Sequence, residues 1–99
     1  MFARLSTYQG SPVPAGGDVI AHSEAIVKQV QELPGFRGVY YLIDRASGTA
    51  KSLTLWDDEQ TMHASENHAT RIREATAQRE GQRIVSVERF EVGFSHLES

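Results

Sequence analysis

The chain has 99 residues, which is enough for one domain, and we expect a single domain over residues 1–99. It contains no cysteine, which excludes disulfides, thiol nucleophiles and thiolate metal sites, and its net charge of −3 argues against a nucleic-acid-binding surface. No apolar run approaches the roughly 20 residues that span a bilayer, and the N-terminus lacks a basic segment followed by an apolar one. We therefore expect a cytoplasmic protein with no membrane or nucleic-acid partner.

The N-terminal third predicts a strand, a loop and a helix. Phe2 to Tyr8 is the expected strand, and residues 10–17 are the loop, because two prolines and three glycines sustain neither a ladder nor a helix. Asp18 is the expected N-cap, and Pro34 and Gly35 stop the helix. The side chains of its inner stripe are spaced three or four apart: Val19, Ser23, Ile26, Val30 and Leu33.

The segment that follows predicts a β-hairpin. Residues 39–43 (VYYLI) are β-branched and aromatic without a polar break, which is typical of a strand buried on both faces. Residues 44–49 hold turn formers, and residues 52–56 (SLTLW) alternate between polar and apolar. With a four-residue turn, Asp44 faces Thr49 and Arg37 lies opposite Trp56. That register places five side chains on one face: Arg37, Tyr41, Ser52, Thr54 and Trp56.

The C-terminal half predicts a second helix and a last strand. Asp57 is the expected N-cap with Gln60 at capping-box spacing, and the helix runs from about Asp58 to Arg79. Gly81 ends it, and residues 83–92 form the strand. The inner stripe of the helix is thin in large side chains, so the helix packs closely or leaves space beneath it: Met62, Ser65, Ala69, Ile72 and Thr76. The arginines outside this stripe are expected on a solvated face: Arg71, Arg73 and Arg79.

The order of these elements predicts an α+β, ferredoxin-like βαββαβ fold. Its four-stranded antiparallel sheet carries both helices on one face. Residues 39–43 need cover on both faces, however, and the chain has no further element for the second face. We therefore expect a homodimer that packs sheet against sheet, a dimeric α/β barrel.

Three motifs carry a resemblance to a known family. LPGF-x-G before a strand, SLTLW before an acidic helix start, and a closing VSVERFEV together resemble the antibiotic biosynthesis monooxygenase-like family of dimeric α/β barrels. The resemblance covers nearly the whole chain and implies a dimeric barrel with a pocket near the sheet. The family includes cofactor-free oxygenases of polycyclic phenols, quinol oxygenases, haem-degrading enzymes and members with no known activity.

The haem-degrading branch does not fit the residues. Its members use an Asn on the first strand and a Trp and a His on the second helix. The only Asn here is Asn67, and the two helix positions fall near Ser65 and Ala75, which neither stack on nor ligate haem.

Four residues are candidates for a site. Trp56, Tyr41 and Arg37 are the candidate substrate-binding residues, since two aromatic rings and a cation hold a flat phenolic anion. The alternative is that Trp56 plugs the barrel end and Arg37 covers it. His63 is the candidate catalytic base for a phenol proton, and its alternative is an exposed helical His. No metal site is expected, because Glu59 and His63 have no evident third ligand.

Two functional hypotheses remain. The first is a cofactor-independent monooxygenase-like protein that acts on an aromatic or polyketide-like small molecule and draws the electrons from its substrate. The second is a non-catalytic dimeric module that binds a small molecule or serves in assembly. RNA binding through the sheet is excluded, because the charge is wrong and the open face is needed for the dimer.

Overall fold

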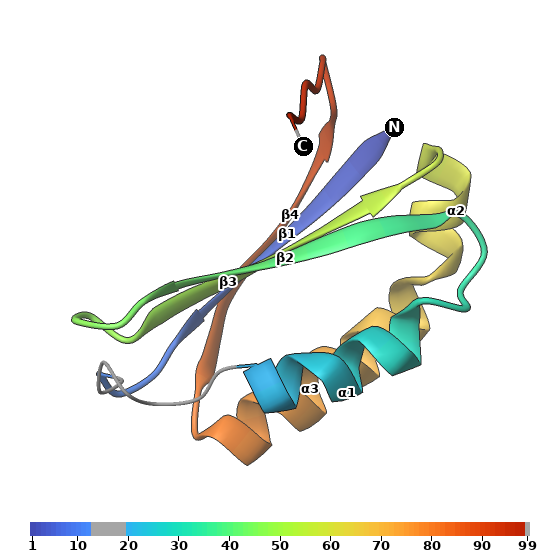
Figure 1. The fold of residues 1–99 in the computed structure, drawn as a ribbon. Coiled ribbons are helices and arrows are strands. Elements are labelled where there is room, and N and C mark those ends of the chain that lie inside the picture. Colours follow the sequence, from blue (N-terminus) through green and yellow to red (C-terminus); the bar gives the residue numbers. More distant parts are fainter. Residues whose placement is uncertain (13–19, 99) are drawn as a thin grey trace.

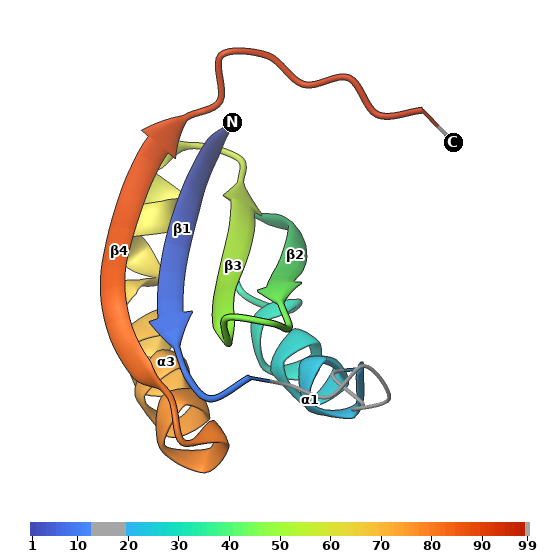
Figure 2. The same ribbon diagram turned by 90° about the vertical axis from the view of Figure 1, so that its left-hand side faces the viewer.

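We describe the protein from a computed structural model of residues 1–12 and 20–98, without the side chains of residues 20–23 and 25. Four strands form an antiparallel sheet in the order β2-β3-β1-β4: β1 (Phe2–Gln9), β2 (Phe36–Asp44), β3 (Thr49–Trp56) and β4 (Arg83–Glu91). Three helices lie on one face of this sheet (Figures 1 and 2): α1 (Ile20–Val30), α2 (Glu59–Ala64) and α3 (Glu66–Glu80). The predicted α+β, ferredoxin-like fold is confirmed.

The strand register decides which side chains face the helices. In β1 and β3, Phe2 pairs with Trp56 and Tyr8 pairs with Ala50. Since side chains alternate along a strand, Arg4 and Ser6 share this inner face with them. The outer face has no helix over it in the described part of the chain. It carries large apolar side chains that are nearly half exposed: Tyr40 at 46%, Leu42 at 48% and Phe90 at 48%.

The hairpin between β2 and β3 has the predicted four-residue turn. Asp44 pairs with Thr49, and the Gly48 amide donates to the Asp44 carbonyl oxygen at 2.9 Å. Gly48 has a φ of 76°, and a Cβ there would lie 2.3 Å from the carbonyl oxygen of Gly10. Only glycine fits both the left-handed backbone and the close approach of the loop after β1.

The single second helix expected from the sequence is divided at Ser65 into α2 and α3. In a continuous helix the Met62 carbonyl oxygen would accept from the amide four residues on. It accepts instead from Arg4 Nη2 at 2.6 Å, from Ser65 Oγ at 2.7 Å and from the Ser65 amide at 3.3 Å. The prediction of one helix is wrong because an arginine from β1 takes a backbone carbonyl of that helix.

The N-cap of α2 is Asp58, one residue after the predicted Asp57. The Asp58 carboxylate accepts from the Thr61 amide at 2.8 Å, and the Thr61 hydroxyl completes a capping box with the Asp58 backbone. Asp57 is used differently: its amide donates to Gly35 O at 2.8 Å and its carboxylate pairs with Arg37. The prediction failed because two adjacent aspartates offered the same signal.

α1 ends at Val30, earlier than the predicted stop at Pro34 and Gly35, so the stripe residue Leu33 lies in the turn that follows. The other boundaries are close to those expected. Gly81 ends α3 in the left-handed conformation, as predicted, and β4 ends at Glu91 rather than at residue 92. The chain then leaves the sheet without regular structure (Figure 2). The predicted cap Asp18 and stripe residue Val19 lie outside the described residues. No helix in the described ranges is both long enough and apolar enough to cross a membrane.

Candidate functional site

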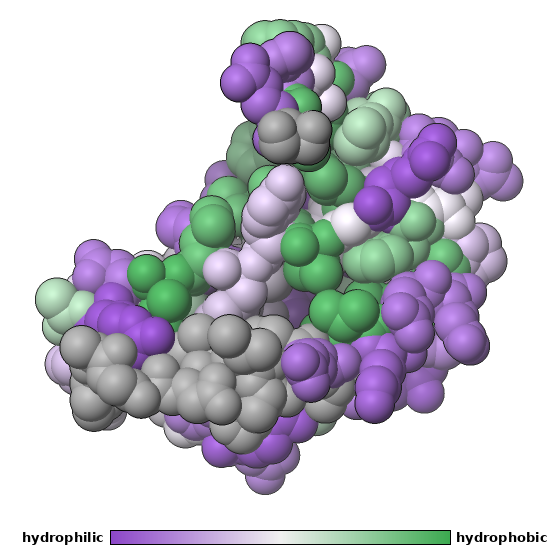
Figure 3. Space-filling view, in the orientation of Figure 1, coloured by the Kyte–Doolittle hydropathy of each residue, from purple (hydrophilic) through white to green (hydrophobic). Residues whose placement is uncertain are grey.

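A cavity of about 60 Å³ lies between the inner face of the sheet and the helices. Of the two outcomes foreseen for the thin stripe of the second helix, close packing or open space, the structure has the open space. Apolar residues gather over β2 and the adjoining part of α1 (Figure 3). The lining residues come from the sheet (Arg4, Ser6, Tyr8, Val39, Tyr41, Ser52, Thr54 and Trp56), from α1 and its turn (Ile26, Val30 and Leu33) and from α3 (Ala69, Ile72, Arg73 and Thr76).

Trp56 forms one end of this cavity and is 1% exposed. Its Nε1 donates to the Thr54 hydroxyl at 3.0 Å, and Phe36 meets it edge-to-face with ring centroids 5.6 Å apart. The guanidinium of Arg4 lies over the ring, 5.4 Å from its centroid, within the range of a cation–π interaction. The indole is therefore fixed from three sides before any ligand arrives.

Arg4 is itself buried, at 2% exposure, and has acceptors for its charge. Its Nη2 donates to Ser65 Oγ at 2.9 Å and to Glu66 Oε1 at 3.0 Å, in addition to the Met62 carbonyl. Glu66 also accepts two hydrogen bonds from Arg89, at 2.7 and 2.8 Å. A buried guanidinium needs such partners, because an unpaired charge in the interior is very costly.

The ionisation of this group follows from its contacts. The hydrogen bonds from Arg89, reinforced by the charge of Arg4, lower the pKa of Glu66 to about 2. Burial lowers the pKa of Arg4, and Glu66 opposes that effect. An arginine nevertheless stays charged in proteins. We call this group the Arg4 cluster: Arg4, Trp56, Ser65, Glu66 and Arg89.

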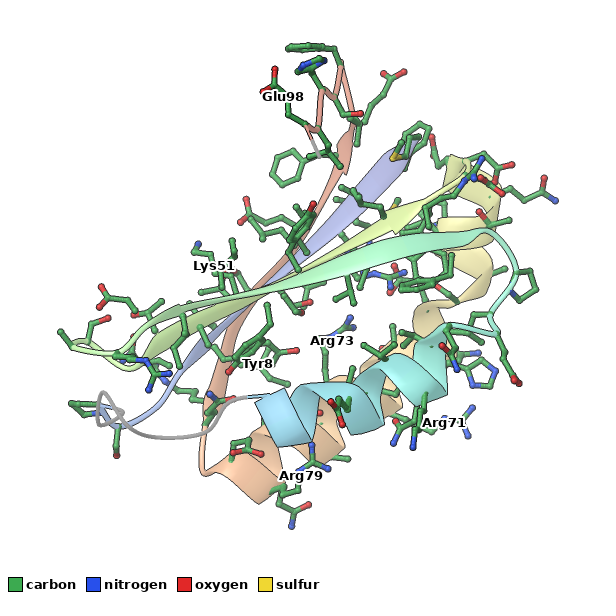
Figure 4. All side chains as sticks on the ribbon, in the orientation of Figure 1. Tyr8, Lys51, Arg71, Arg73, Arg79 and Glu98 are labelled. Atoms are coloured by element: carbon green, nitrogen blue, oxygen red, sulfur yellow. The ribbon has the colours of Figure 1, made fainter. Side chains whose placement is uncertain are left out.

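The other part of the cavity is bordered by Tyr8 and Arg73. Tyr8 is buried against Ala50 and Ala77, and burial raises the pKa of its phenol. Figure 4 shows Tyr8 reaching from the sheet and Arg73 reaching from α3 into the space between them, whereas Arg71 points away from the sheet. Arg73 therefore does not belong to the solvated face on which the sequence pattern placed it.

Two of the predicted binding residues line the cavity together. Tyr41 and Trp56 share its wall with Ser52 and Thr54, as the predicted register required. The expected position of Arg37 is wrong. A bulge between Phe36 and Gly38 puts Phe36 opposite Trp56 and turns Arg37 out of the ladder.

Arg37 and His63 both lie outside the cavity lining. The Arg37 side chain is 63% exposed and pairs with Asp57. His63 is 56% exposed, and its Nε2 lies 3.4 Å from Glu59 Oε1. The role of His63 as a base stays a prediction. The described lining holds no histidine and no carboxylate, and no three His, Asp or Glu side chains in the described ranges stand close enough to share a metal ion.

Sequence reasoning did not single out Arg4, Tyr8 or Arg73. Residues 2–8 alternate, so Arg4, Ser6 and Tyr8 had to share one face, but the pattern does not show that this polar face is the inner one. For Arg73 a signal was present. It lies four residues after Ala69 and three before Thr76, which is the spacing of the inner stripe itself.

Comparisons with known proteins find distant relatives. No protein-family model matches the chain. The uncharacterized proteins MT2634 and Rv2557 of Mycobacterium tuberculosis (strains CDC 1551 / Oshkosh and H37Rv) are each 28% identical over 96 residues, which is 97% of this chain and 42% of theirs. The uncharacterized protein Rv2558 of strain H37Rv is 27% identical over 77 residues, covering 78% of this chain and 33% of its own. The chain thus spans less than half the length of these relatives.

Proposed function

We propose that this chain is a small-molecule-binding module that takes a flat, largely apolar ligand into the cavity between sheet and helices. The observation that carries the proposal is the cavity itself, with Trp56 and Tyr41 on its wall and apolar side chains from α1 opposite them. An apolar hollow with a few convergent polar groups is the usual form of a ligand site. The described lining offers no residue that is a base at neutral pH, which favours binding over catalysis.

The size of the cavity limits the ligand. Its volume of about 60 Å³ has room for several water molecules. A cavity that holds benzene measures about 150 Å³, so a single ring enters only when α1 or the lining side chains shift outward. We therefore expect single-ring ligands to bind before polycyclic ones.

The test uses the only tryptophan as a reporter. Phenol, benzamide and benzoate are titrated against the wild-type protein, and saturable quenching of Trp56 fluorescence is expected. Ala69→Leu fills the cavity and should abolish the quenching. Ala75→Leu, on the exposed side of the same helix, should leave it unchanged. Failure of all three ligands, or undiminished quenching in Ala69→Leu, contradicts the proposal.

Cofactor-free oxygenation is the second candidate function, favoured by the positive charges of Arg4 and Arg73 beside the aromatic wall. These charges would stabilise a phenolate or enolate, the form that reacts with dioxygen. In such a reaction the substrate supplies the electrons: a ring CH₂ group and O₂ give a carbonyl and water.

Oxygen consumption tests this candidate without any added cofactor. An anthrone or hydroquinone should raise oxygen uptake above the buffer rate. His63→Ala should slow that uptake about a hundredfold if His63 is the base. Ligand binding without oxygen uptake contradicts the oxygenase candidate and is consistent with the binding module.

We further propose that two copies pair through the outer face of the sheet. An apolar surface is exposed there by Tyr40, Leu42 and Phe90. Exposed apolar patches of this kind mark surfaces that bind another protein. The mycobacterial relatives support the pairing indirectly, because more than half of their length lies outside the match, which is room for a second unit of this size.

Light scattering tests the pairing. The wild-type chain should be a dimer at micromolar concentration, and Leu42→Lys should be a folded monomer. Gln78→Lys, on the exposed side of α3, is the control and should remain a dimer. A wild-type monomer at every concentration contradicts the pairing.

A further inference from the structure

The cavity is bordered by an excess of positive charge. Arg4 and Arg73 line it, and Arg89 joins Arg4 through their common partner Glu66. Glu66 balances one of the charges of Arg4 and Arg89, and Arg73 adds a further one, so a surplus of two positive charges remains near the cavity. In such surroundings charges act on one another more strongly than in water.

The two arginines of the lining differ in their partners. Arg4 is held by Glu66, Ser65 and a backbone carbonyl through its Nε and Nη2 atoms. Arg73 donates to the Thr70 hydroxyl at 3.1 Å, and no carboxylate among the described residues lies within salt-bridge distance of it. Its guanidinium therefore has donors to offer to a ligand.

Tyr8 adds a neutral donor or acceptor at the same place. Because burial raises the pKa of its phenol, Tyr8 keeps its proton at neutral pH. The positive charge of Arg73 acts to lower the pKa of both Tyr8 and Arg4, so Arg73 is close enough to interact electrostatically with both parts of the cavity. The lining also includes the apolar side chains of Val30 and Ile72.

We propose that Tyr8 and Arg73 form an anion subsite, and that the ligand of this cavity is a small aromatic carboxylic acid. Its ring would pack on the apolar wall, and its carboxylate would accept hydrogen bonds from the Arg73 guanidinium, whose fork matches a carboxylate in geometry. This inference deepens the proposed binding function and rests on it. It replaces Arg37, the cation suggested by the sequence, with Arg73.

The test compares two ligands of nearly equal shape that differ in charge. Benzoate and neutral benzamide are titrated by calorimetry against the full chain at pH 7 and low salt. Wild-type protein should bind benzoate at least about tenfold more tightly than benzamide. Arg73→Gln should abolish this preference by weakening the binding of benzoate more than that of benzamide. Arg71→Gln, which removes an arginine pointing away from the sheet, should behave as wild type.

The outcomes separate this inference from the function on which it rests. Equal affinities in the wild type, or a preference that survives Arg73→Gln, overturn the anion subsite while the binding module stands. Binding of neither ligand overturns both. Arg73→Lys keeps the charge but not the fork, so it should retain part of the preference and covers the case in which Arg73→Gln does not fold.

Discussion

The two parts of the cavity each hold an arginine, and their surroundings make the two residues different in kind. Arg4 lies over the Trp56 indole and donates hydrogen bonds to a carboxylate, a hydroxyl and a backbone carbonyl. The second helix is divided where Arg4 binds that carbonyl. Arg73 reaches the same space from α3 with a threonine hydroxyl as its described hydrogen-bond partner. We therefore assign Arg4 a structural role, and we propose that the Arg73 guanidinium binds a ligand. Burial of the charge does not distinguish a structural arginine from a ligand-binding one. The hydrogen-bond acceptors around the guanidinium do.

The largest effect that would sharpen this contrast is expected from Arg4→Met. Removing the guanidinium leaves the Met62 carbonyl without its arginine donor and takes away the cation above Trp56. We expect a loss of about 3 kcal/mol in the free energy of unfolding. Arg37→Met is the matched control, because its exposed pair with Asp57 contributes about 1 kcal/mol or less. Urea denaturation measures both, and equal small losses would show that the Arg4 cluster is not structural.

The pH dependence of the Arg4 cluster is the next effect in size. A carboxylate whose pKa falls from 4.5 to about 2 on folding stabilises the folded state above pH 4.5 and loses that contribution as the pH drops toward 2. The full difference corresponds to about 3.4 kcal/mol. Glu66 is partly open to solvent, and screening reduces the expected change to about 1–2 kcal/mol.

Glu66→Gln isolates this contribution, because it removes the titrating group and nearly keeps its shape. The difference in urea midpoint between wild type and Glu66→Gln should shrink steadily between pH 5 and pH 2. A difference that stays constant over this range would mean that Glu66 is not held in its charged form by Arg4 and Arg89.

The fold could be predicted because it depends on patterns that repeat over many residues. The hairpin register followed from the turn at residues 45–48, and the stripe of the second helix already showed too few large side chains to fill the space beneath it. Tyr41 and Trp56 shared a wall for the same reason: side chains alternate regularly once the turn is fixed.

The site could not be predicted to the same depth, because single contacts decide it. One bulge at Arg37 removed the expected cation, and its signal in the sequence is a single glycine inside the strand, Gly38. The division at Ser65 depends on Arg4, which is distant in sequence and lies on the inner face of β1. Helix propensity is a local property of the sequence and contains no information on such a long-range contact.

A smaller effect is expected where α2 begins, since this helix carries the Met62 carbonyl that Arg4 binds. The Asp58 side chain caps the helix, and its hydrogen bond from the Thr61 amide lowers the pKa of its carboxyl group. Asp58→Ala should lower the free energy of unfolding, because the Thr61 amide at the start of the helix loses its side-chain acceptor. Asp57→Ala should cost less, because its carboxylate makes only an exposed pair. Equal losses would mean that the cap is shared between the two aspartates.

The smallest effect on stability is expected at Arg73. Whether the free energy of unfolding rises or falls there distinguishes a ligand-binding residue from a structural one. Arg73→Met replaces a half-buried cation by an apolar side chain that keeps the stem but lacks the guanidinium. Because the described structure gives Arg73 no carboxylate, removing its charge frees the folded state of a desolvation cost, and we expect stability to stay unchanged or to rise by up to about 1 kcal/mol. A residue kept for a ligand lowers stability in this way, whereas a structural one does not. Thermal unfolding of the variant beside Arg4→Met decides the point: a loss of more than about 1 kcal/mol at Arg73 would make both arginines structural and remove the contrast between the two parts of the cavity.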